Sequence, residues 1–458
     1  MVFPTLQFVL FFAVVLAVNG MVWSRPTARK ATLIAASYTF YGAWDVRFLA
    51  LMAGVSTVAW VGGLIRSKLA KILSITILIA TLGVFKYFNF FMLNFAQLLN
   101  TLGLERDLQW ASIILPVGIS FYTFQAVSYV MDAHRGHIEP RRNPTDVFLY
   151  ISFFPQLVAG PIVRAAHFLP QIDAPTRPDS NARALAVVLI LMGLFKKMVV
   201  ANYLSVLLVD PVYALPDGQN TLTAIAGALG YAVQIYCDFS GYSDIAIGIA
   251  LLLGYRFQRN FNQPYRADSL RNFWQRWHIS LSVWIRDYLY IPLGGNHGSA
   301  AKRNFTVLLT MTLGGLWHGA GWNFLIWGFL HGAGLAVERV FRSSNTSLPK
   351  PVAVTVVFTF VVLLWVPFRA ADFGDTLAFF TALFTLNGFA PVELTATIWG
   401  LIAIGLALSW LPLRWLSDAE FALSHLPATV QASILALGIW ILFATAQEGV
   451  APFIYFQF

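Results

Sequence analysis

The stretch that decides the fold is TLTAIAGALGYAVQIYCDFSGYSDIAIGIALLLG, residues 221–254. Its first half carries no charge, and only Asp238 and Asp244 interrupt the apolar pattern of the second half. About 20 apolar residues span a bilayer as a helix, so the stretch predicts one long tilted membrane helix or two short ones. Further uncharged runs cover residues 1–24 and 72–85. The pattern predicts an integral membrane protein.

The composition of the whole chain points the same way. The 458 residues are 58% hydrophobic and 11% charged, whereas a soluble domain averages roughly 25% charged residues. A soluble enzyme and a disordered tail are thereby excluded, and the single Cys237 excludes an internal disulfide scaffold. An outer-membrane barrel would show alternating segments of about ten residues, and these runs are longer and continuously apolar. The fold class predicted is an all-α polytopic membrane protein with about 11–13 transmembrane or re-entrant helices.

The basic residues predict orientation. The net charge is +9, and the cations cluster between apolar runs, where they set topology beside anionic membrane lipid, so no nucleic-acid partner is expected. Residues 3–23 have no basic leader and are followed by Arg25, Arg29 and Lys30. This pattern predicts an uncleaved first helix with a periplasmic N-terminus.

Two later segments depart from plain spans. Residues 146–163 contain Pro155 and Pro161, which predicts a broken or re-entrant element. Residues 183–209 carry Lys196 and Lys197 in their middle, where a lipid-facing helix would not accept them. We expect these lysines to mark a cytoplasmic surface or the end of a half-helix.

The first polar cluster is YCDFSGYSDIAIG, residues 236–248. Asp238 and Tyr242, and likewise Ser240 and Asp244, are four residues apart and share a helix face. Carboxylates inside a membrane are costly, which makes them functional candidates by default. One reading is that a carboxylate binds a catalytic group or an acceptor hydroxyl. The other reading is that the cluster fixes helix packing or pairs with arginines from the next segment.

The second cluster, residues 272–296, is aromatic and basic. Rings and guanidinium groups alternate around His278: Arg271, Trp274, Arg276, Trp277, Trp284, Arg286, Tyr288 and Tyr290. This mixture is typical of the bilayer interface. A lone histidine is usually structural, but its surroundings here predict that His278 lines a site.

The third cluster, residues 309–332, places His318 in an otherwise apolar run. Small residues surround it: Gly314, Gly315, Gly319, Ala320 and Gly321. They predict either a passage for a ligand or the close packing of His318 against a neighbouring helix. Imidazole is the side chain best suited to exchange a proton near neutral pH. His331 would lie about 20 Å from His318 along one continuous helix, so it is not expected to be its partner.

Several known catalytic and metal-binding motifs are absent from the sequence, which excludes some classes of reaction. The chain has no HExxH, CxxC or GxxxxGK[ST] motif, so no metal site, thiol redox centre or nucleotide-hydrolysis site is predicted, and no bound cofactor is expected. A secondary transporter is a remote alternative, because broken helices with intramembrane aspartates suit one. The chain shows no paired halves with matching interruptions.

Several blocks of sequence resemble one enzyme family. They are LPVGISFYTFQAVSYVMDAHRG (115–136), FFPQLVAGPIVR (153–164), DFSGYSD (238–244), FWQRWHISLSVWIRDYLYIPLGG (273–295) and GGLWHG (314–319). Together, in this order, they resemble the membrane-bound O-acyltransferase (MBOAT) family, and within it the branch of the alginate O-acetyltransferase membrane subunit. The resemblance implies a single domain over residues 1–458. It would comprise N-terminal spans (1–110), a motif-bearing core (115–332) and C-terminal spans (351–458) around a tunnel that holds the catalytic histidine.

The activity that the resemblance implies is acyl transfer in a bacterial inner membrane. An acetyl group would move from a cytoplasmic thioester donor such as acetyl-CoA toward the periplasm, for O-acetylation of an exopolysaccharide such as alginate. A separate periplasmic or membrane-tethered, esterase-like partner protein would complete the transfer. The alternative within the family is D-alanyl transfer to teichoic acid from a carrier-protein thioester.

The resemblance also assigns roles to residues. The histidine of the family's WHG motif falls on His318 and that of its RWH motif on His278, so both are expected in catalysis. His318 would act as general base or as transient acyl carrier. The expected supporting or tunnel residues are Asp238, Ser240, Tyr242, Asp244, Trp274, Arg276, Trp277, Trp317 and Asn323. Charge alone suggests Lys196, Lys197 and Arg256 for binding the donor.

Overall fold

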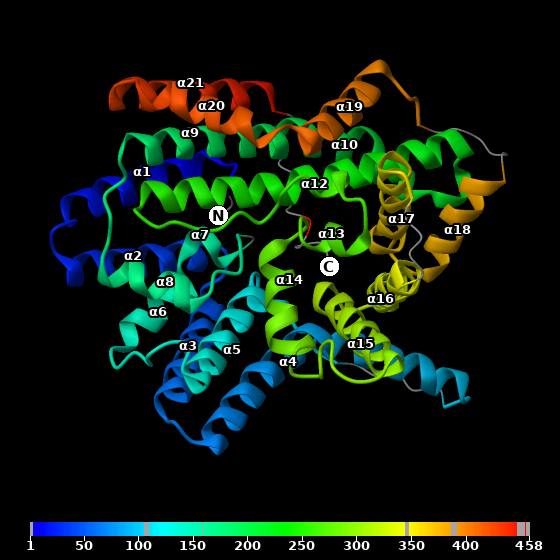
Figure 1. Cartoon of the computed structure of the whole chain (residues 1–458), viewed down its shortest axis with the longest axis horizontal. Coiled ribbons are helices and arrows are strands. Elements are labelled where there is room, and N and C mark those ends of the chain that lie inside the picture. The colour runs from blue at the N-terminus through cyan, green and yellow to red at the C-terminus, as the bar shows by residue number, and fades with distance from the viewer. Residues whose placement is uncertain are drawn as a thin grey trace. The chain divides into compact units, whose positions relative to one another are not determined.

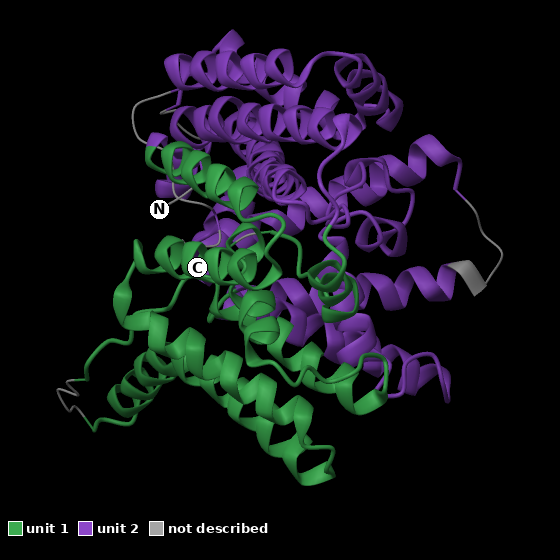
Figure 2. Cartoon of the chain, turned by 90° about the vertical axis from the view of Figure 1, so that its left-hand side faces the viewer, with its two compact units in different colours: residues 1, 7–175, 319–321 green, residues 2–6, 176–318, 322–458 purple. Residues whose placement is uncertain are grey.

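The computed structural model describes residues 3–104, 110–158, 160–343, 348–385, 392–446 and 454, which form helices and turns without a β-strand. The chain divides into two compact units (Figure 2). Unit 1 comprises residues 1, 7–175 and 319–321, and unit 2 comprises residues 2–6, 176–318 and 322–458. The all-α prediction is confirmed. The boundary near residue 175 falls inside the predicted core 115–332, and the single domain stays a prediction.

Seven helices in the described ranges are long and apolar enough to cross a membrane. They are Val46–Leu64, Lys68–Thr101, Ser180–Ala214, Thr221–Leu252, Trp322–Phe341, Lys350–Arg369 and Ala428–Thr445. The pair Ala396–Trp410 and Leu413–Ser424, bent by 83°, makes an eighth if it is one broken span. The protein is therefore a multi-pass membrane protein. The predicted total of 11–13 includes shorter elements and stays a prediction.

Unit 1 is built from the first eight α-helices (Figure 1). They are α1 (Leu6–Met21), α2 (Pro26–Gly42), α3 (Leu49–Leu64), α4 (Lys68–Thr101), α5 (Ile119–Arg135), α6 (Pro144–Ser152), α7 (Phe154–Leu157) and α8 (Ala165–Asp173), with the short helix η1 (Val46–Phe48) before α3. The interruption predicted within residues 146–163 is present, because α6 ends before Phe153 and the next helix has only four residues.

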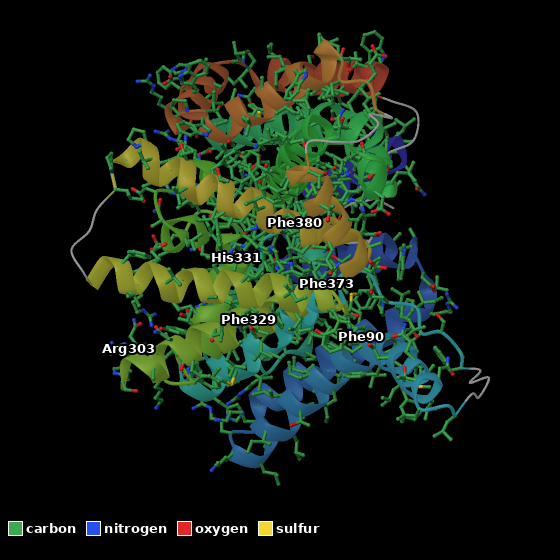
Figure 3. The ribbon with its side chains drawn as sticks, turned by 90° about the vertical axis from the view of Figure 1, so that its right-hand side faces the viewer. Phe90, Arg303, Phe329, His331, Phe373 and Phe380 are labelled. Atoms are coloured by element: carbon green, nitrogen blue, oxygen red, sulfur yellow. The ribbon has the colours of Figure 1, made fainter. Side chains whose placement is uncertain are left out.

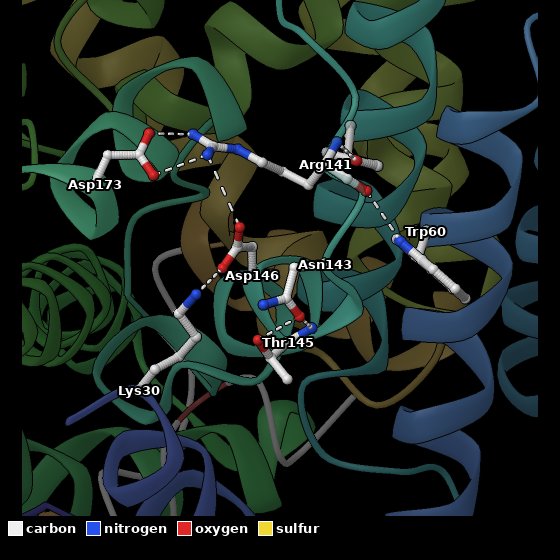
Figure 4. Close-up of polar contacts among 8 residues, drawn as sticks. Lys30, Trp60, Arg141, Asn143, Thr145, Asp146 and Asp173 are labelled. Carbon is white, nitrogen blue, oxygen red and sulfur yellow. Dashed lines mark hydrogen bonds and ion pairs between the residues drawn. The ribbon is translucent and has the colours of Figure 1, made fainter. Parts of the chain in front are cut away.

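A polar network joins several helices of unit 1 (Figure 4). Lys30 of α2 pairs with Asp146 of α6, whose other carboxylate oxygen lies 3.8 Å from Arg141. The Arg141 guanidinium also donates two hydrogen bonds, of 2.8 and 2.5 Å, to Asp173 at the end of α8. The indole N–H of Trp60 in α3 donates to the Arg141 carbonyl at 3.0 Å. Four helix segments are thus held by one linked set of polar contacts.

Unit 2 contains the remaining helices (Figure 1). They are α9 (Ser180–Leu194), η2 (Phe195–Ala201), α10 (Asn202–Leu204), η3 (Ser205–Val209), α11 (Asp210–Ala214), η4 (Pro216–Gly218), α12 (Thr221–Leu252), η5 (Pro264–Arg266), α13 (Leu270–Trp274), α14 (Ile279–Ile285), η6 (Arg286–Tyr290), α15 (Ala300–His318), α16 (Trp322–Ser343), α17 (Lys350–Arg369), α18 (Phe373–Phe384), α19 (Ala396–Trp410), α20 (Leu413–Ser424) and α21 (Ala428–Thr445). The stretch 221–254 forms one long helix, the first of the two predicted alternatives.

α12 is the central helix of unit 2. Asn220 caps its N-terminus by accepting a hydrogen bond of 2.8 Å from the Thr223 N–H, which satisfies one of the free donors of the first turn. α12 crosses α9 with backbone in close contact, because a Cβ on Gly193 would lie 2.5 Å from the Gly241 carbonyl oxygen. Only glycine permits that approach. Apolar residues of the two helices pack beyond the crossing: Ala186, Leu189, Ile247 and Leu251.

Both ends of the described chain are anchored on α12. The Phe3 ring stacks on Tyr242 with centroids 4.7 Å apart, and the Phe3 N–H donates to the Tyr242 hydroxyl at 3.5 Å. The N–H of Ile454 donates to a carboxylate oxygen of Asp238 at 2.9 Å. Phe3 and Ile454 are both buried.

Candidate active site

His318 is carried by a hairpin of two helices, α15 and α16, joined by residues 319–321. The helices cross with glycines in contact: a Cβ on Gly315 would lie 2.2 Å from the Phe324 carbonyl oxygen, and one on Gly328 would lie 2.3 Å from that of Met311. Gly315 therefore serves helix packing, the second of the two predicted roles for the small residues. His318 ends α15, just before the chain turns back.

The His318 side chain is buried and enclosed by rings. Its imidazole makes edge contacts with Trp317, Trp327 and Phe368, at centroid separations of 5.0, 5.1 and 5.3 Å. The residue nevertheless lines a cavity of about 500 Å³. Gly314, one turn earlier on α15, lines the same cavity. Gly314 therefore borders open space beside the packed contact at Gly315, and the passage stays a prediction.

The cavity is apolar along its walls and basic at its opening. The walls come from α14, α15 and α16: Leu281, Ile285, Val307, Met311 and Leu335. Exposed or half-buried charged residues mark the opening, where Arg271, Arg286 and Arg339 contribute three positive charges and Glu338 one negative charge. Val307 and His318 lie on the same helix about 17 Å apart. The cavity thus leads from a cationic opening to a buried imidazole.

Two contacts fix the helices around this opening. Glu338 of α16 accepts a hydrogen bond from the backbone N–H of Leu270, which holds the start of α13 against α16. Arg339 donates to Asn304 of α15 at 3.1 Å. Figure 3 shows Arg303 near the start of α15, and His331 on the partner helix α16. These contacts hold α13 and α15 against the end of α16 that carries Glu338 and Arg339, two of the charged residues that line the cavity.

His278 is held next to this arrangement by a hydrogen-bonded network. Its Nδ1 lies 3.2 Å from Oδ1 of Asn260, and the Asn260 amide donates to Ser243 of α12 at 3.2 Å. Its ring centroid lies 6.0 Å from that of Trp317, the residue before His318. The backbone of His278 has φ +41°, a left-handed conformation that is uncommon outside glycine and clusters at functional sites.

The protonation state of His278 follows from its surroundings. The residue is fully buried between Phe239 and Phe261, at centroid separations of 4.6 and 6.5 Å. Burial disfavours the charged imidazolium and lowers the pKa of His278 to about 3. The imidazole is therefore neutral at physiological pH and can position a neighbour through hydrogen bonds and ring contacts.

The two carboxylates of α12 pair with lysines. Lys197 Nζ lies 2.5 Å from Asp238, and Lys196 Nζ lies 2.7 Å from Asp244. Both lysines belong to η2, a π-helical turn, and both are buried. The expectation that they mark a cytoplasmic surface or a half-helix end is therefore wrong. The packing reading of the aspartates is supported, with lysines of the preceding helix in place of the arginines expected from the next segment.

Some of the remaining predicted site residues lie near the two histidines, and others lie elsewhere in unit 2. Trp274 lines the His318 cavity and Trp317 contacts both histidines. Trp277 packs in the core against Trp365, at a centroid separation of 4.9 Å. Ser240 and Tyr242 are buried on α12, and the Asn323 amide donates to the Ala370 carbonyl at 3.1 Å. Arg256 is exposed and Arg276 lines a different cavity.

His331 is closer to the site than one continuous helix would allow. Because the chain turns back after His318, both histidines contact Trp327, at centroid separations of 5.1 Å for His318 and 4.7 Å for His331. His331 is fully buried, and Phe273 and Trp274 also contact its ring. The expected separation of about 20 Å therefore does not apply.

The sequence reading missed several residues of the cavity. Glu338 and Arg339 belong to no cluster that the sequence singled out, and Trp327 lies in the third cluster but was given no role. Arg271 and Arg286 were assigned to the bilayer interface. Helix spacing could have grouped Trp327, Leu335, Glu338 and Arg339 loosely on one side of α16. No local signal shows that this side faces α13 and α14, since those segments lie far away in sequence.

Comparisons with a family model and with known proteins agree on one family. The sequence model of the MBOAT, membrane-bound O-acyltransferase family matches residues 73–366. The chain is 37% identical to a Pseudomonas putida protein named "Probable alginate O-acetylase AlgI", over 94% of each chain. It is 35% identical to a peptidoglycan O-acetyltransferase of Helicobacter pylori, over 81% of this chain and 76% of that one.

A third relative, which is less similar to this chain, is named for a different activity. A teichoic acid D-alanyltransferase of Streptococcus thermophilus is 27% identical over 52% of this chain and 60% of its own length. The family match covers more than half of the chain, and the two stronger relatives align over most of it. It follows that this chain belongs to the membrane-bound O-acyltransferase family.

Proposed function

We propose that the chain is an O-acetyltransferase that takes an acetyl group from a thioester donor and passes it toward a polysaccharide. The observation that carries the proposal is the position of His318 at the buried end of a cavity of about 500 Å³ with an arginine-rich opening. An anionic donor would bind at the opening, and its uncharged arm would follow the apolar walls.

The donor site proposed here differs from the one expected from charge alone. Lys196 and Lys197 are each paired with an aspartate of α12, whereas Arg271, Arg286 and Arg339 line the His318 cavity. Guanidinium groups bind phosphate oxygens through paired N–H donors. Acetyl-CoA carries phosphates at one end and the thioester at the other, which matches a basic opening followed by an apolar channel.

The chemistry assigned to His318 is proton transfer or acyl transfer. As general base, Nδ1 or Nε2 takes the proton of an acceptor hydroxyl while its oxygen attacks the thioester carbonyl. The tetrahedral intermediate then expels the thiolate, which takes that proton from the imidazolium. As acyl carrier, the imidazole nitrogen itself attacks the thioester carbonyl and the C–S bond breaks to release the thiolate; the acceptor hydroxyl then attacks the acetyl-imidazole, which restores the imidazole, and the hydroxyl proton passes to the thiolate. His278, held by Asn260, positions Trp317 beside His318.

The direction of transfer rests on charge. Arg303 lies near the start of α15, and Arg339, which lines the cavity, donates to Asn304 beside it. Basic residues favour the cytoplasmic side, so the donor would enter from the cytoplasm of a bacterial inner membrane, with the N-terminus in the periplasm. A periplasmic or membrane-tethered esterase-like partner would pass the acetyl group to the final acceptor.

The names of the relatives suggest the acceptor class. The two stronger relatives are named for alginate and for peptidoglycan, which are both polysaccharides. We therefore propose an exopolysaccharide or cell-wall polysaccharide, with alginate as the first to test. D-alanyl transfer is the alternative, because a D-alanyltransferase is among the weaker relatives.

The test compares three strains: wild type, His318→Ala and His425→Ala. His425 is an exposed histidine directly after α20 and serves as matched control. Ester-linked acetate and D-alanine are released from surface polysaccharide by mild base, and the membrane abundance of each variant is measured. Loss of a catalytic proton acceptor costs on the order of 100-fold or more in rate.

Acetate should fall in His318→Ala alone, at normal abundance. Unchanged acetate in that variant would refute the catalytic role of His318. If ester-linked D-alanine is lost instead of acetate, the protein transfers D-alanyl groups and the proposal of acetyl transfer is refuted.

The donor site has its own test in purified protein. Arg271→Gln, Arg286→Gln and Arg339→Gln should each raise the KM for acetyl-CoA by about tenfold, since one charge-assisted contact contributes about 1.5 kcal/mol. Arg256→Gln removes an exposed arginine that does not line the cavity and is the control. Equal KM values in all four variants would refute this donor site.

A further inference from the structure

Unit 2 contains a second cavity, of about 670 Å³. It lies between the start of α17, the end of α19 and the segment 263–276. The short helix α13 separates it from the His318 cavity, because Arg271 and Trp274 line one cavity while Asn272 lines the other. No step of the proposed acyl transfer uses this second cavity.

The lining of the cavity carries a net positive charge. Arg266, Arg276 and Lys350 line it together with a single acid, Asp268. The Lys350 ammonium has no ion-pair or hydrogen-bond partner among the residues that the structure describes. The Arg266 guanidinium lies over the Trp410 ring, 5.4 Å from its centroid. The cations that line the cavity thus exceed the acids by two.

The backbone of α17 adds to this positive potential. Lys350 and Pro351 begin the 20-residue helix, and no side chain caps its N-terminus. The first N–H groups of a helix lack partners within it and carry a partial positive charge, which favours an anion at that position. Val354 and Thr355 extend the same first turns along the cavity wall. The first turn of α17 therefore adds partial positive charge to the lining of this cavity.

The other walls of the cavity are apolar and belong to membrane helices. Val354 and Phe358 come from α17, and Leu406 and Trp410 come from α19. α17 is long and apolar enough to span a bilayer, and α19 forms the first half of the bent pair. Gln263 donates to the Leu411 carbonyl where that pair bends. The cavity therefore combines a net positive charge with a surface that suits hydrocarbon.

We propose that this cavity binds an anionic phospholipid, with its phosphate between Arg266, Arg276 and Lys350 and an acyl chain against Val354, Phe358 and Leu406. The cations favour a ligand that carries a phosphate. The apolar walls favour one that also carries a hydrocarbon chain, so a lipid is expected to bind more tightly than a soluble anion. Anionic lipids attract basic side chains at a membrane surface. Phosphatidylglycerol, whose phosphate carries one negative charge, is the anionic phospholipid to test.

The test measures lipid retained by the full-length protein. Purified protein in detergent is incubated with phosphatidylglycerol or phosphatidylcholine of the same chain length, and bound lipid is counted by native mass spectrometry. The double variant Arg266→Gln/Lys350→Gln removes two cations from the cavity. The control Arg414→Gln/Lys302→Gln removes the same charges from exposed positions that do not line it. Val354→Trp fills the apolar side and leaves every cation in place.

We expect wild type and control to retain phosphatidylglycerol over phosphatidylcholine. The Arg266→Gln/Lys350→Gln variant should weaken that retention by on the order of tenfold, and Val354→Trp should weaken retention of both lipids. Equal retention by wild type and the cavity variant would overturn the proposal. So would displacement of the lipid by equimolar glycerol 1-phosphate or adenosine 3′,5′-bisphosphate, because the site would then take a soluble phosphate.

Discussion

The buried pair of Lys197 and Asp238 supports a quantitative prediction. Both side chains are at most 4% exposed, and their charged atoms are 2.5 Å apart. Removing one partner of a buried pair leaves an uncompensated charge and costs about 3–5 kcal/mol. Lys197→Met keeps the approximate length of the side chain and removes the ammonium group. We expect it to lower the unfolding temperature by on the order of 5–10 °C.

A second substitution should recover most of that loss. In Lys197→Met/Asp238→Asn neither member of the pair is charged, and the amide carbonyl introduced at position 238 can still accept the hydrogen bond that Ile454 donates. Neutral replacements of buried pairs are often close to neutral in stability. The double variant should therefore lie within about 1–2 kcal/mol of wild type. The pair of Lys196 and Asp244 is less buried, at 10% and 22% exposed. Lys196→Met should therefore destabilise the protein less than Lys197→Met does.

The assay is thermal unfolding of the purified variants in lipid nanodiscs, followed by size-exclusion chromatography with fluorescence detection. A Lys197→Met variant whose unfolding temperature cannot be told from that of wild type would refute the energetic role of the pair. So would a double variant no more stable than the single one. Acetyl transfer by the double variant also separates two readings of Asp238, because a purely structural carboxylate predicts activity at the level of its folded fraction.

Three further predictions concern the site and its helices. Gly314→Leu places a side chain in the His318 cavity and should block transfer at normal membrane abundance; activity equal to wild type would show that the donor takes another path. Gly328→Ala should destabilise the hairpin by about 1–3 kcal/mol, whereas Gly400→Ala, where nothing lies within 4 Å of the added Cβ, should not; equal unfolding temperatures would contradict this. His278 has a pKa of about 3 when folded, against 6.5 ordinarily, so its contribution to stability is complete above pH 6.5 and falls as the pH drops toward 3. His278→Asn, which tolerates the left-handed backbone, should show a smaller loss of unfolding temperature between neutral pH and about pH 5, and an unchanged loss would count against the buried neutral state.

The helices were predictable because hydropathy is a local property. Residues 221–254 are apolar for longer than a span requires, and they form α12 with an end within two residues of the predicted one. The same measure missed the turn between α15 and α16. Residues 319–321 do not lower the mean hydropathy of the segment, because they are glycine and alanine, whereas charged residues would lower it. The turn is nevertheless what brings His331 to Trp327.

Pairing between distant residues was not predictable in the same way. Lys196 and Asp244 are 48 positions apart in the sequence. Nothing near Lys196 indicates its partner, so a surface position was the natural expectation for a lysine. The π-helical turn that contains both lysines is set by packing against α12, which no local propensity encodes.

The candidate site was predictable in part for a related reason. His318 stood out as a titratable group among glycines in an apolar run, a pattern visible within a few neighbouring residues. The arginines of the cavity opening come from α13, from η6 and from α16. They meet only because separate packing contacts place these three elements around one space. The sequence showed the catalytic candidate, and the fold was needed to show what surrounds it.

The anchoring of both chain ends on α12 bears on biosynthesis. A ribosome makes Phe3 before every membrane helix of the described chain and Ile454 after all of them, yet the two residues attach to positions 242 and 238 of one helix. Asp238 can find Lys197 before Ile454 is made, but its second hydrogen bond must wait until Ile454 has been made. A chain that stops before Ile454 would lack that bond on α12, a defect that a quality-control protease could use to tell such chains from those that contain Ile454.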